Sequence, residues 1–302
     1  MTRARSKVLQ CCSSLPATRR VTPLLALLLA GCGSPAVAPT TPAPSATPIT
    51  VGDPLDVAVL TDGTLVIADR RGDRLLRRAP DGALTVWVTL PEPRDLAHAP
   101  DGALYVAAAQ RIVRVAPDGT ATDVATLPAV VLGLATGPGG TLYASEDGVR
   151  VHRVDPATGR LTLLAGTGSR GYGGDGGPAT AALVDGVHGI LPLGDGRVLI
   201  ADSGSGRVRE VRDGVIRSVA ADLDLPSAMA VAPGGGTLVA AFGDGTIRHL
   251  ADDGTVSTYA EVDAPAGMDV TADGTVYVTS IRTRTVHRVD PASRVVTEVP
   301  LR

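Results

Sequence analysis

The sequence predicts an all-β fold, a six-bladed β-propeller with four antiparallel strands in each blade. Three observations support this: a repeat of regular length, short β-branched strands inside it, and two turns in every repeat, most of which contain glycine. The first turn recurs at intervals of 39, 38, 56, 40 and 38 residues, so the long interval holds an insertion of about 17 residues. These turns are Asp62-Gly63, Asp101-Gly102, Gly139-Gly140, Asp195-Gly196, Gly235-Gly236 and Asp273-Gly274.

The segment that follows each first turn is predicted to be a strand. Such segments are short, rich in β-branched or aromatic residues and bounded by turn residues; examples are 64–68, 103–107, 197–201 and 275–279. The Asp-Gly dipeptides predict tight hairpins, because both of their residues can take positive φ at low cost.

A second turn in each repeat predicts a second hairpin. Four repeats use Asp-Gly here (81–82, 118–119, 213–214 and 253–254), and the third and sixth use the segments 155–159 and 290–294. Two hairpins in about 40 residues make one propeller blade. Six blades then form a ring over residues 49–302. The last blade contains all four of its strands, so we expect closure by packing, with residues 49–51 able to add hydrogen bonds at an edge.

Three segments give the chain a resemblance to the NHL-repeat propeller family over residues 51 to about 300. They are the blade opening at 265–274, the strand at 199–202 followed by Arg207 and Arg209, and the glycine-rich insertion 165–183. The chain lacks the paired asparagines that usually precede the third-strand arginine of the family, and it contains no asparagine at all. The resemblance implies a propeller that serves as a binding platform more often than as an enzyme.

The first 32 residues are predicted to be a lipoprotein signal peptide. A basic region ends at Arg20, and the apolar run that follows is too short to span a bilayer as a helix. The run ends in the segment 29–32, which resembles a lipobox and makes Cys32 the site of lipid attachment. No cysteine follows Cys32, so the exported part has no disulfide. Residues 33–48 are rich in proline and are expected to be an extended stalk.

The charge of the exported part argues against nucleic-acid binding. After residue 32 the chain holds 23 basic and 31 acidic residues, with no block of one sign. A nucleic-acid-binding surface needs a basic patch that displaces counterions from phosphates. Aromatic residues make up 2% of the chain, which leaves little stacking surface for sugars or bases.

Asp56 and Asp95 are the leading candidates for a site. They occupy equivalent positions at the expected channel mouth of the first two blades, where the other four blades have Gly133, Gly189, Ala228 and Gly267. Two interpretations stay open. The pair could hold a divalent cation, which prefers oxygen ligands, or each carboxylate could accept hydrogen bonds from backbone amides at the start of a strand.

Other polar residues are expected in the loops on the same face, where a rigid propeller presents its ligand contacts. They are Asp69, Glu146, Asp202 and Arg207 from the blades, with Tyr172 and His188 from or beside the insertion. Residues placed as Asp202 and Arg207 more often pair with each other across the loop of their own blade than they bind a ligand. The insertion resembles a phosphate loop only in its glycines; we expect a compact turn in which Asp175 accepts hydrogen bonds from backbone amides.

These residues favour a non-catalytic binding propeller, held at the outer side of the membrane by its lipid alone. The expected partner is a small polar ligand or another envelope protein. The alternative is a metal-assisted hydrolase or lyase of the gluconolactonase type, acting through Asp56, Asp95, Glu146 and His188. The alternative requires these four side chains to converge at one channel mouth.

The lipobox predicts that C32S releases the protein from the membrane. Serine cannot form the thioether to the lipid, so the variant should appear in the soluble fraction after cell fractionation, whereas the parent chain sediments with membranes. C12S, which changes a cysteine inside the signal region, is the matched control and should leave the parent distribution unchanged. Continued sedimentation of the C32S chain would contradict the prediction.

Overall fold

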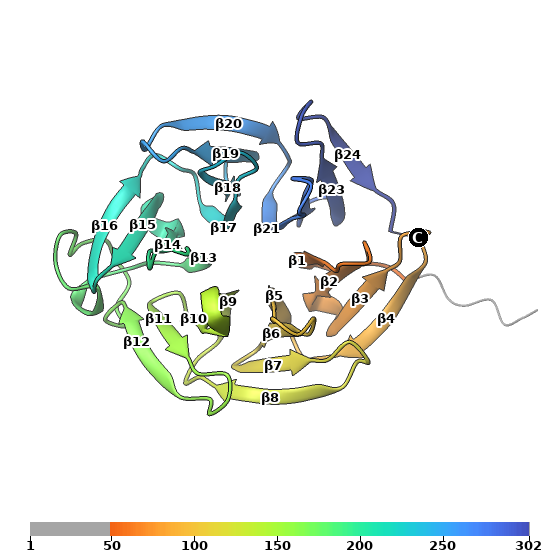
Figure 1. The fold of residues 1–302 in the computed structure, drawn as a ribbon, viewed down its shortest axis with the longest axis horizontal. Helices are drawn as coiled ribbons and strands as arrows, with labels where there is room; N and C mark the ends of the chain where they lie inside the picture. The colour runs from red at the N-terminus through yellow and green to blue at the C-terminus, as the bar shows by residue number, and fades with distance from the viewer. Residues whose placement is uncertain (1–48, 302) are drawn as a thin grey trace, which may run out of the picture. The chain divides into compact units, whose positions relative to one another are not determined.

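The computed structural model of the chain describes residues 49–301, which form a ring of six four-stranded sheets (Figure 1). In every sheet the four strands are consecutive in sequence and antiparallel, as predicted. The signal region, Cys32 and the stalk at 33–48 lie outside the described residues. Within the described part, no helix is long and apolar enough to cross a membrane.

The first strand of each blade lies nearest the axis of the ring (Figure 1). Neighbouring first strands contact one another around the whole circle. These strands are β1 (Pro54–Val59), β5 (Pro93–His98), β9 (Val131–Thr136), β13 (Val187–Pro192), β17 (Pro226–Val231) and β21 (Pro265–Val270).

The second strands form the core of the ring. Every residue of the first five is buried, because each strand pairs on both edges and packs on neighbouring blades through both faces. One apolar cluster, for example, joins Val66 of the first blade to Leu96 and Val106 of the second. The second strands are β2 (Leu65–Asp69), β6 (Leu104–Ala108), β10 (Leu142–Glu146), β14 (Val198–Asp202), β18 (Thr237–Ala241) and β22 (Val276–Ser280).

The third and fourth strands complete each blade toward the rim, and the fourth strands are the most exposed. The third strands are β3 (Arg74–Arg78), β7 (Arg111–Val115), β11 (Arg150–Val154), β15 (Arg207–Arg212), β19 (Thr246–Leu250) and β23 (Thr285–Val289). The fourth strands are β4 (Leu84–Thr89), β8 (Ala121–Thr126), β12 (Leu161–Ala165), β16 (Val215–Ala220), β20 (Val256–Glu261) and β24 (Val296–Val299). Four single 3₁₀ turns occur in loops: η1 (Arg70–Gly72), η2 (Pro138–Gly140), η3 (Ala179–Ala181) and η4 (Ser203–Ser205).

The Asp-Gly turns differ from the prediction in their backbone conformation. Among the Asp-Gly turns named above, only Asp213-Gly214 has positive φ at both residues. In the others, the glycine alone is left-handed, as in the loop where Gly63 N–H donates to Leu60 O. The aspartate instead accepts a hydrogen bond from the amide two residues on, as Asp62 does from Thr64 at 2.9 Å. The carboxylate therefore stabilises a three-residue loop with a left-handed third residue.

The ring closes without exchange of a strand between the first and last blades. Val57 and Leu65 of the first blade share an apolar cluster with Val286 and Val299 of the last, and Ile49 packs on its edge. Hydrogen bonds cross the same junction: Val59 N donates to Asp269 Oδ2 at 2.7 Å. Closure by packing is thus as expected, but residues 49–51 form no strand.

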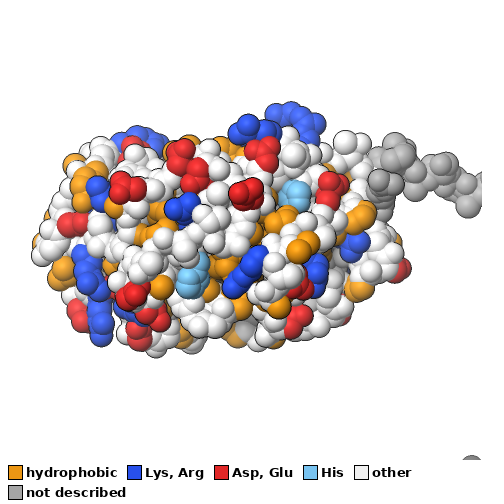
Figure 2. Space-filling view, turned by 90° about the horizontal axis from the view of Figure 1, so that it is seen from above, with side chains coloured by type: hydrophobic (Ala, Val, Ile, Leu, Met, Phe, Trp, Pro, Cys, Tyr) orange, Lys and Arg blue, Asp and Glu red, His pale blue; other side chains and the backbone are white. Residues whose placement is uncertain are grey.

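The rim carries charges of both signs. In the view of Figure 2, acidic and basic side chains of the described residues are interspersed and separated by apolar ones. Many of them form exposed ion pairs, such as Arg111 with Asp123 at 2.9 Å. Pairs of this kind contribute little stability, because water screens them.

The insertion between β12 and β13 covers the outer edge of the fourth blade. Its backbone pairs with β16, since Gly176 N donates to Ile216 O at 2.8 Å and Ile216 N donates to Gly177 O at 3.1 Å. Asp175 accepts a hydrogen bond from Ser218 N at 2.9 Å, in the role expected for it. The insertion thus protects an open sheet edge.

Arg209 of β15 anchors this insertion from beneath. Its side chain is 0% exposed and donates to the carbonyl oxygens of Leu183 at 2.6 Å and Gly173 at 2.9 Å. It also forms ion pairs with Asp175 and, at 3.4 Å, with the fully buried Asp202. A buried guanidinium with its donors satisfied in this way fixes the loop to the blade.

We therefore expect R209A to destabilise the protein by about 3–5 kcal/mol, because the change leaves Asp202 as an uncompensated buried charge. R212A removes an arginine from the same strand whose side chain is 57% exposed, and should change the free energy of unfolding by no more than about 0.5 kcal/mol. Urea unfolding followed by circular dichroism measures both. Equal effects of the two changes would show that Arg209 does not anchor the insertion.

Candidate functional site

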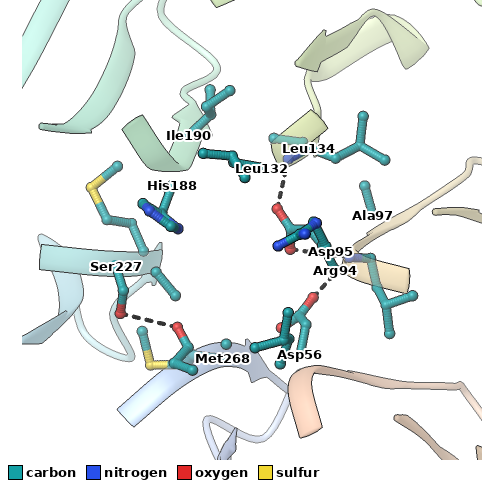
Figure 3. Close-up of a pocket in the computed structure, with 18 of the residues that line it drawn as sticks. Asp56, Arg94, Asp95, Ala97, Leu132, Leu134, His188, Ile190, Ser227 and Met268 are labelled. Atoms are coloured by element: carbon teal, nitrogen blue, oxygen red, sulfur yellow. Dashed lines mark hydrogen bonds between the residues drawn. The ribbon is translucent and has the colours of Figure 1, made fainter. Parts of the chain in front are cut away.

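A cavity of about 570 Å³ lies on the axis of the ring, enclosed by the first strands of the blades (Figure 3). Most of its lining is apolar, with Leu132, Leu134, Ile190, Met229 and Met268 prominent. Loops after the second strands contribute Phe242 and Ile281 at the mouth. The polar side chains that reach it are few: Asp56, Arg70, Arg94, Asp95, His98, Thr136, His188, Ser203 and Ser227.

Small residues at one register let the first strands approach so closely. A Cβ at Gly133 would lie 1.9 Å from the carbonyl oxygen of His188, and one at Gly189 would lie 2.5 Å from that of Ser227. A Cβ at Gly267 would lie 2.0 Å from Oδ1 of Asp56. Close packing therefore requires glycine at these three positions, whereas Asp56, Asp95 and Ala228 carry a Cβ at the equivalent positions of the other blades.

Asp56 and Asp95 connect successive blades through backbone amides. Asp56 Oδ2 accepts from Leu96 N of the second blade at 2.8 Å, and Asp95 Oδ2 accepts from Leu134 N of the third blade at 2.6 Å. Asp95 Oδ1 also accepts from Leu96 N at 3.0 Å (Figure 3). This geometry is the amide-accepting arrangement, the second of the two interpretations of the pair.

Burial changes the ionisation of both carboxyl groups. It raises the pKa of Asp56 well above its usual value, and the charge of Asp95 raises it further. Burial also raises the pKa of Asp95 to about 6, although hydrogen bonds from Asp56 and from backbone amides oppose the rise. Both groups therefore hold a proton more readily than an ordinary aspartate does.

His188 projects into the cavity from β13, and Arg94 reaches it from β5 (Figure 3). Burial lowers the pKa of His188, and the positive charges of Arg94 and Arg170 lower it further. The imidazole is therefore neutral at pH 7. Arg94 Nη2 forms an ion pair with Glu92 Oε2 at 2.8 Å, and its Nε is buried without a hydrogen-bond partner among the described residues.

Five residues predicted for the site do not line the cavity, and two of them support local structure instead. Asp69 Oδ1 accepts from the amides of Gly52 and Asp53, each at 2.9 Å, while its Oδ2 pairs with Arg74. Glu146 is buried and pairs with His152 Nε2 at 2.7 Å. Burial inside a blade takes both carboxylates away from the mouth.

The other three lie on the fourth blade. Asp202 accepts from Asp185 N at 2.8 Å and pairs with Arg209, so the expected pair of Asp202 with Arg207 is wrong. The guanidinium of Arg207 lies 4.5 Å from the ring centroid of Tyr172. Tyr172 is 48% exposed and its hydroxyl donates to Asp175 at 3.2 Å. The insertion thus supplies the partners that local sequence could not indicate.

The four side chains that the enzymatic alternative requires do not converge. Asp56, Asp95 and His188 line the cavity, but Glu146 does not. Among the described residues, no group of three or more His, Cys, Asp and Glu side chains is placed to hold a metal ion. Arg94, which lies between Pro93 and Asp95 in β5, was not predicted from the sequence. Its position next to Asp95, a predicted site residue, could have indicated it.

No protein-family model matches the chain, and no curated protein matches it in sequence. Solved structures share its fold. A virginiamycin B lyase from Staphylococcus aureus is 16% identical, with a TM-score of 0.61 over 83% of this chain and 85% of the lyase. A gluconolactonase from Xanthomonas campestris is 17% identical, with a TM-score of 0.61 over 76% of this chain and 84% of that one.

An auxiliary nutrient-binding protein from Bacteroides thetaiotaomicron is 11% identical, with a TM-score of 0.64 over 82% of this chain and 70% of that one. Likeness at these identities shows the six-bladed β-propeller fold alone, since one fold hosts many functions. The protein is thus a six-bladed propeller with structural neighbours of the gluconolactonase type. The assignment of its repeats to the NHL type stays a prediction.

The carboxyl pair predicts a pH-dependent stability. Because the folded pKa of Asp95, about 6, exceeds the ordinary value of 3.8, and that of Asp56 is also raised, the folded state binds more protons than the unfolded state above pH 4. The stabilisation that the protonated pair contributes to the folded state is therefore complete at low pH and is lost as pH rises through 6.

We expect D56N to become more stable relative to the parent chain as pH rises from 5 to 8. The difference in their free energies of unfolding should grow by at most about 1.4 kcal/mol per pH unit. The amide keeps an acceptor for Leu96 N and removes a carboxyl group whose pKa burial raises. D123N, at an exposed carboxylate of β8, is the control and should not alter the pH profile. Unfolding in urea across this range provides the comparison, and parallel profiles for D56N and the parent would reject a raised pKa of Asp56.

Proposed function

We propose that the propeller is a non-catalytic binding protein that takes a small organic molecule into its axial cavity. The cavity carries the proposal: its volume of about 570 Å³ falls in the range of small-molecule sites, and it combines an apolar lining with a few polar groups. The lining is more apolar than a purely polar ligand would require.

The state of the carboxyl pair supports binding rather than catalysis. Asp56 and Asp95 already accept hydrogen bonds from Leu96 N and Leu134 N, so their oxygens serve the ring. A cation held by the pair would compete with these amides for the carboxylate oxygens. Each buried amide that lost its acceptor would cost about 1–3 kcal/mol.

A tether outside the cell remains part of the proposal. The lipobox at 29–32 and the proline-rich stalk at 33–48 support it from sequence. A binding domain held on a stalk could collect its ligand near the membrane surface.

One observation favours the enzymatic alternative. His188 and Asp95 share the cavity, and both have pKa values shifted from their ordinary ones in the way that general acids and bases often do. A lyase and gluconolactonases also share the fold. The alternative would use His188 as the base, with Asp56 and Asp95 as cation ligands.

The double change D56A/D95A separates the two functions. We expect it to destabilise the protein by about 1–2 kcal/mol, because the amides of Leu96 and Leu134 lose their acceptors while the protein no longer has to bury two carboxyl groups, which offsets part of that loss. The loss should be the same with and without Mg²⁺, Mn²⁺ or Ca²⁺ in thermal unfolding. Metal-dependent hydrolysis of a lactone or ester by the parent chain, abolished in the double variant, would reject the binding function and establish the enzyme.

Occupation of the cavity is tested with 8-anilinonaphthalene-1-sulfonate, whose fluorescence rises on binding to apolar sites. The full-length C32S chain avoids detergent, and we expect it to bind one equivalent. L132W fills the cavity and should abolish that binding, while V86W, at an exposed position of β4 on the rim, should not. Equal binding by both variants would place the dye elsewhere and contradict the proposed function.

A further inference from the structure

The polar groups of the cavity divide into those already engaged and those still available. The acceptors are engaged: Asp56 and Asp95 receive backbone amides. The hydroxyl of Ser227 lies 3.1 Å from the carbonyl oxygens of Pro265 and Ala266, to which it can donate. The charged group least engaged inside the lining is the guanidinium of Arg94, whose ion pair among the described residues is with Glu92, a residue outside the lining.

Arg94 is placed to receive an anion. Its side chain is 18% exposed, so an ion pair formed there is partly shielded from water. Its present partner Glu92 is 55% exposed and lies outside the cavity lining, so that pair is a weak one at the rim. The planar guanidinium carries five donors in a fork that matches a carboxylate or sulfonate.

His188 lies opposite Arg94 across the cavity (Figure 3). A neutral imidazole keeps one N–H to donate and adds no positive charge that would need its own anion. Burial and the nearby charges of Arg94 and Arg170 keep the pKa of His188 low. An anionic group between the two side chains would meet a guanidinium on one side and a neutral donor on the other.

The rest of the lining determines what kind of ligand body fits the cavity. Leu132, Ile190, Met229 and Met268 surround the space beyond the two polar side chains. Apolar atoms of a ligand are favourable there because they leave water. Burial raises the pKa of both Asp56 and Asp95, which lowers the negative charge that an anion would meet, and backbone amides already solvate the pair.

We propose that the cavity selects small amphipathic organic anions, with the single carboxylate or sulfonate on Arg94 and His188 and the apolar body against the leucine and methionine side chains. The proposal rests on the proposed function, since it names the ligand class of the same cavity. It assigns specificity to Arg94, a residue of the first strand, rather than to the acidic pair.

The test uses 4-phenylbutyrate and its neutral amide as competitors of 8-anilinonaphthalene-1-sulfonate on the full-length C32S chain. The two competitors share an apolar body and differ only in charge. We expect the carboxylate to displace the dye at a concentration at least ten-fold lower than the amide. R94Q should remove this preference, and R94K should restore part of it.

R282Q is the matched control, because Arg282 is a 68% exposed arginine of a loop after a second strand and lies outside the cavity lining. It should keep the full preference, which excludes a general effect of surface charge. Equal displacement by the two competitors, or an unchanged preference in R94Q, would overturn the anion selectivity while leaving the cavity as a binding site. If L132W left dye binding unchanged, that result would instead overturn the proposed function.

Discussion

The whole ring depends on how closely the six first strands approach one another at the axis. At one register the backbones are so near that a Cβ on Gly133 or Gly267 would overlap an atom of the next blade. Where a blade carries a larger residue there, as at Asp56 and Asp95, its carboxylate reaches the next blade and accepts an amide. Neighbouring blades are thus joined at this register by close backbone packing in some places and by hydrogen bonds from an aspartate in others. Because no strand is exchanged between the ends, this contact must hold the junction as well.

This constraint also decides the chemistry of the cavity. The acidic pair that would attract a cation in open water is desolvated, has raised pKa values and links three successive blades. The lining also presents an arginine, an imidazole and a large apolar wall to a ligand. A metal ion would compete with the buried amides for the oxygens of these carboxylates, and a displaced amide would lose its acceptor.

The fourth blade shows how an insertion becomes part of the core. Residues 166–183 add backbone bonds to β16, and Arg209 satisfies two of their carbonyl groups while neutralising Asp202 beneath them. Without the insertion, Arg209 would lose the carbonyl groups of Leu183 and Gly173 and the carboxylate of Asp175, and would keep the ion pair with Asp202. The glycines at 173 and 174 and the acid at 175 are therefore parts of one structural unit rather than of a ligand loop.

The sequence by itself determined the number of blades, the order of their strands and the position of the insertion, because turn chemistry and strand propensity act over a few residues and repeat along the chain. It also placed Asp56, Asp95 and His188 at the axis, since their register in the repeat is a local property. Only the tertiary structure decided that Glu146 turns to His152, that Asp202 pairs with Arg209 instead of Arg207, and that Arg94 enters the cavity. Partners of long charged side chains come from neighbouring strands, blades or the insertion, and their choice follows from burial and distance in space, which no local pattern records.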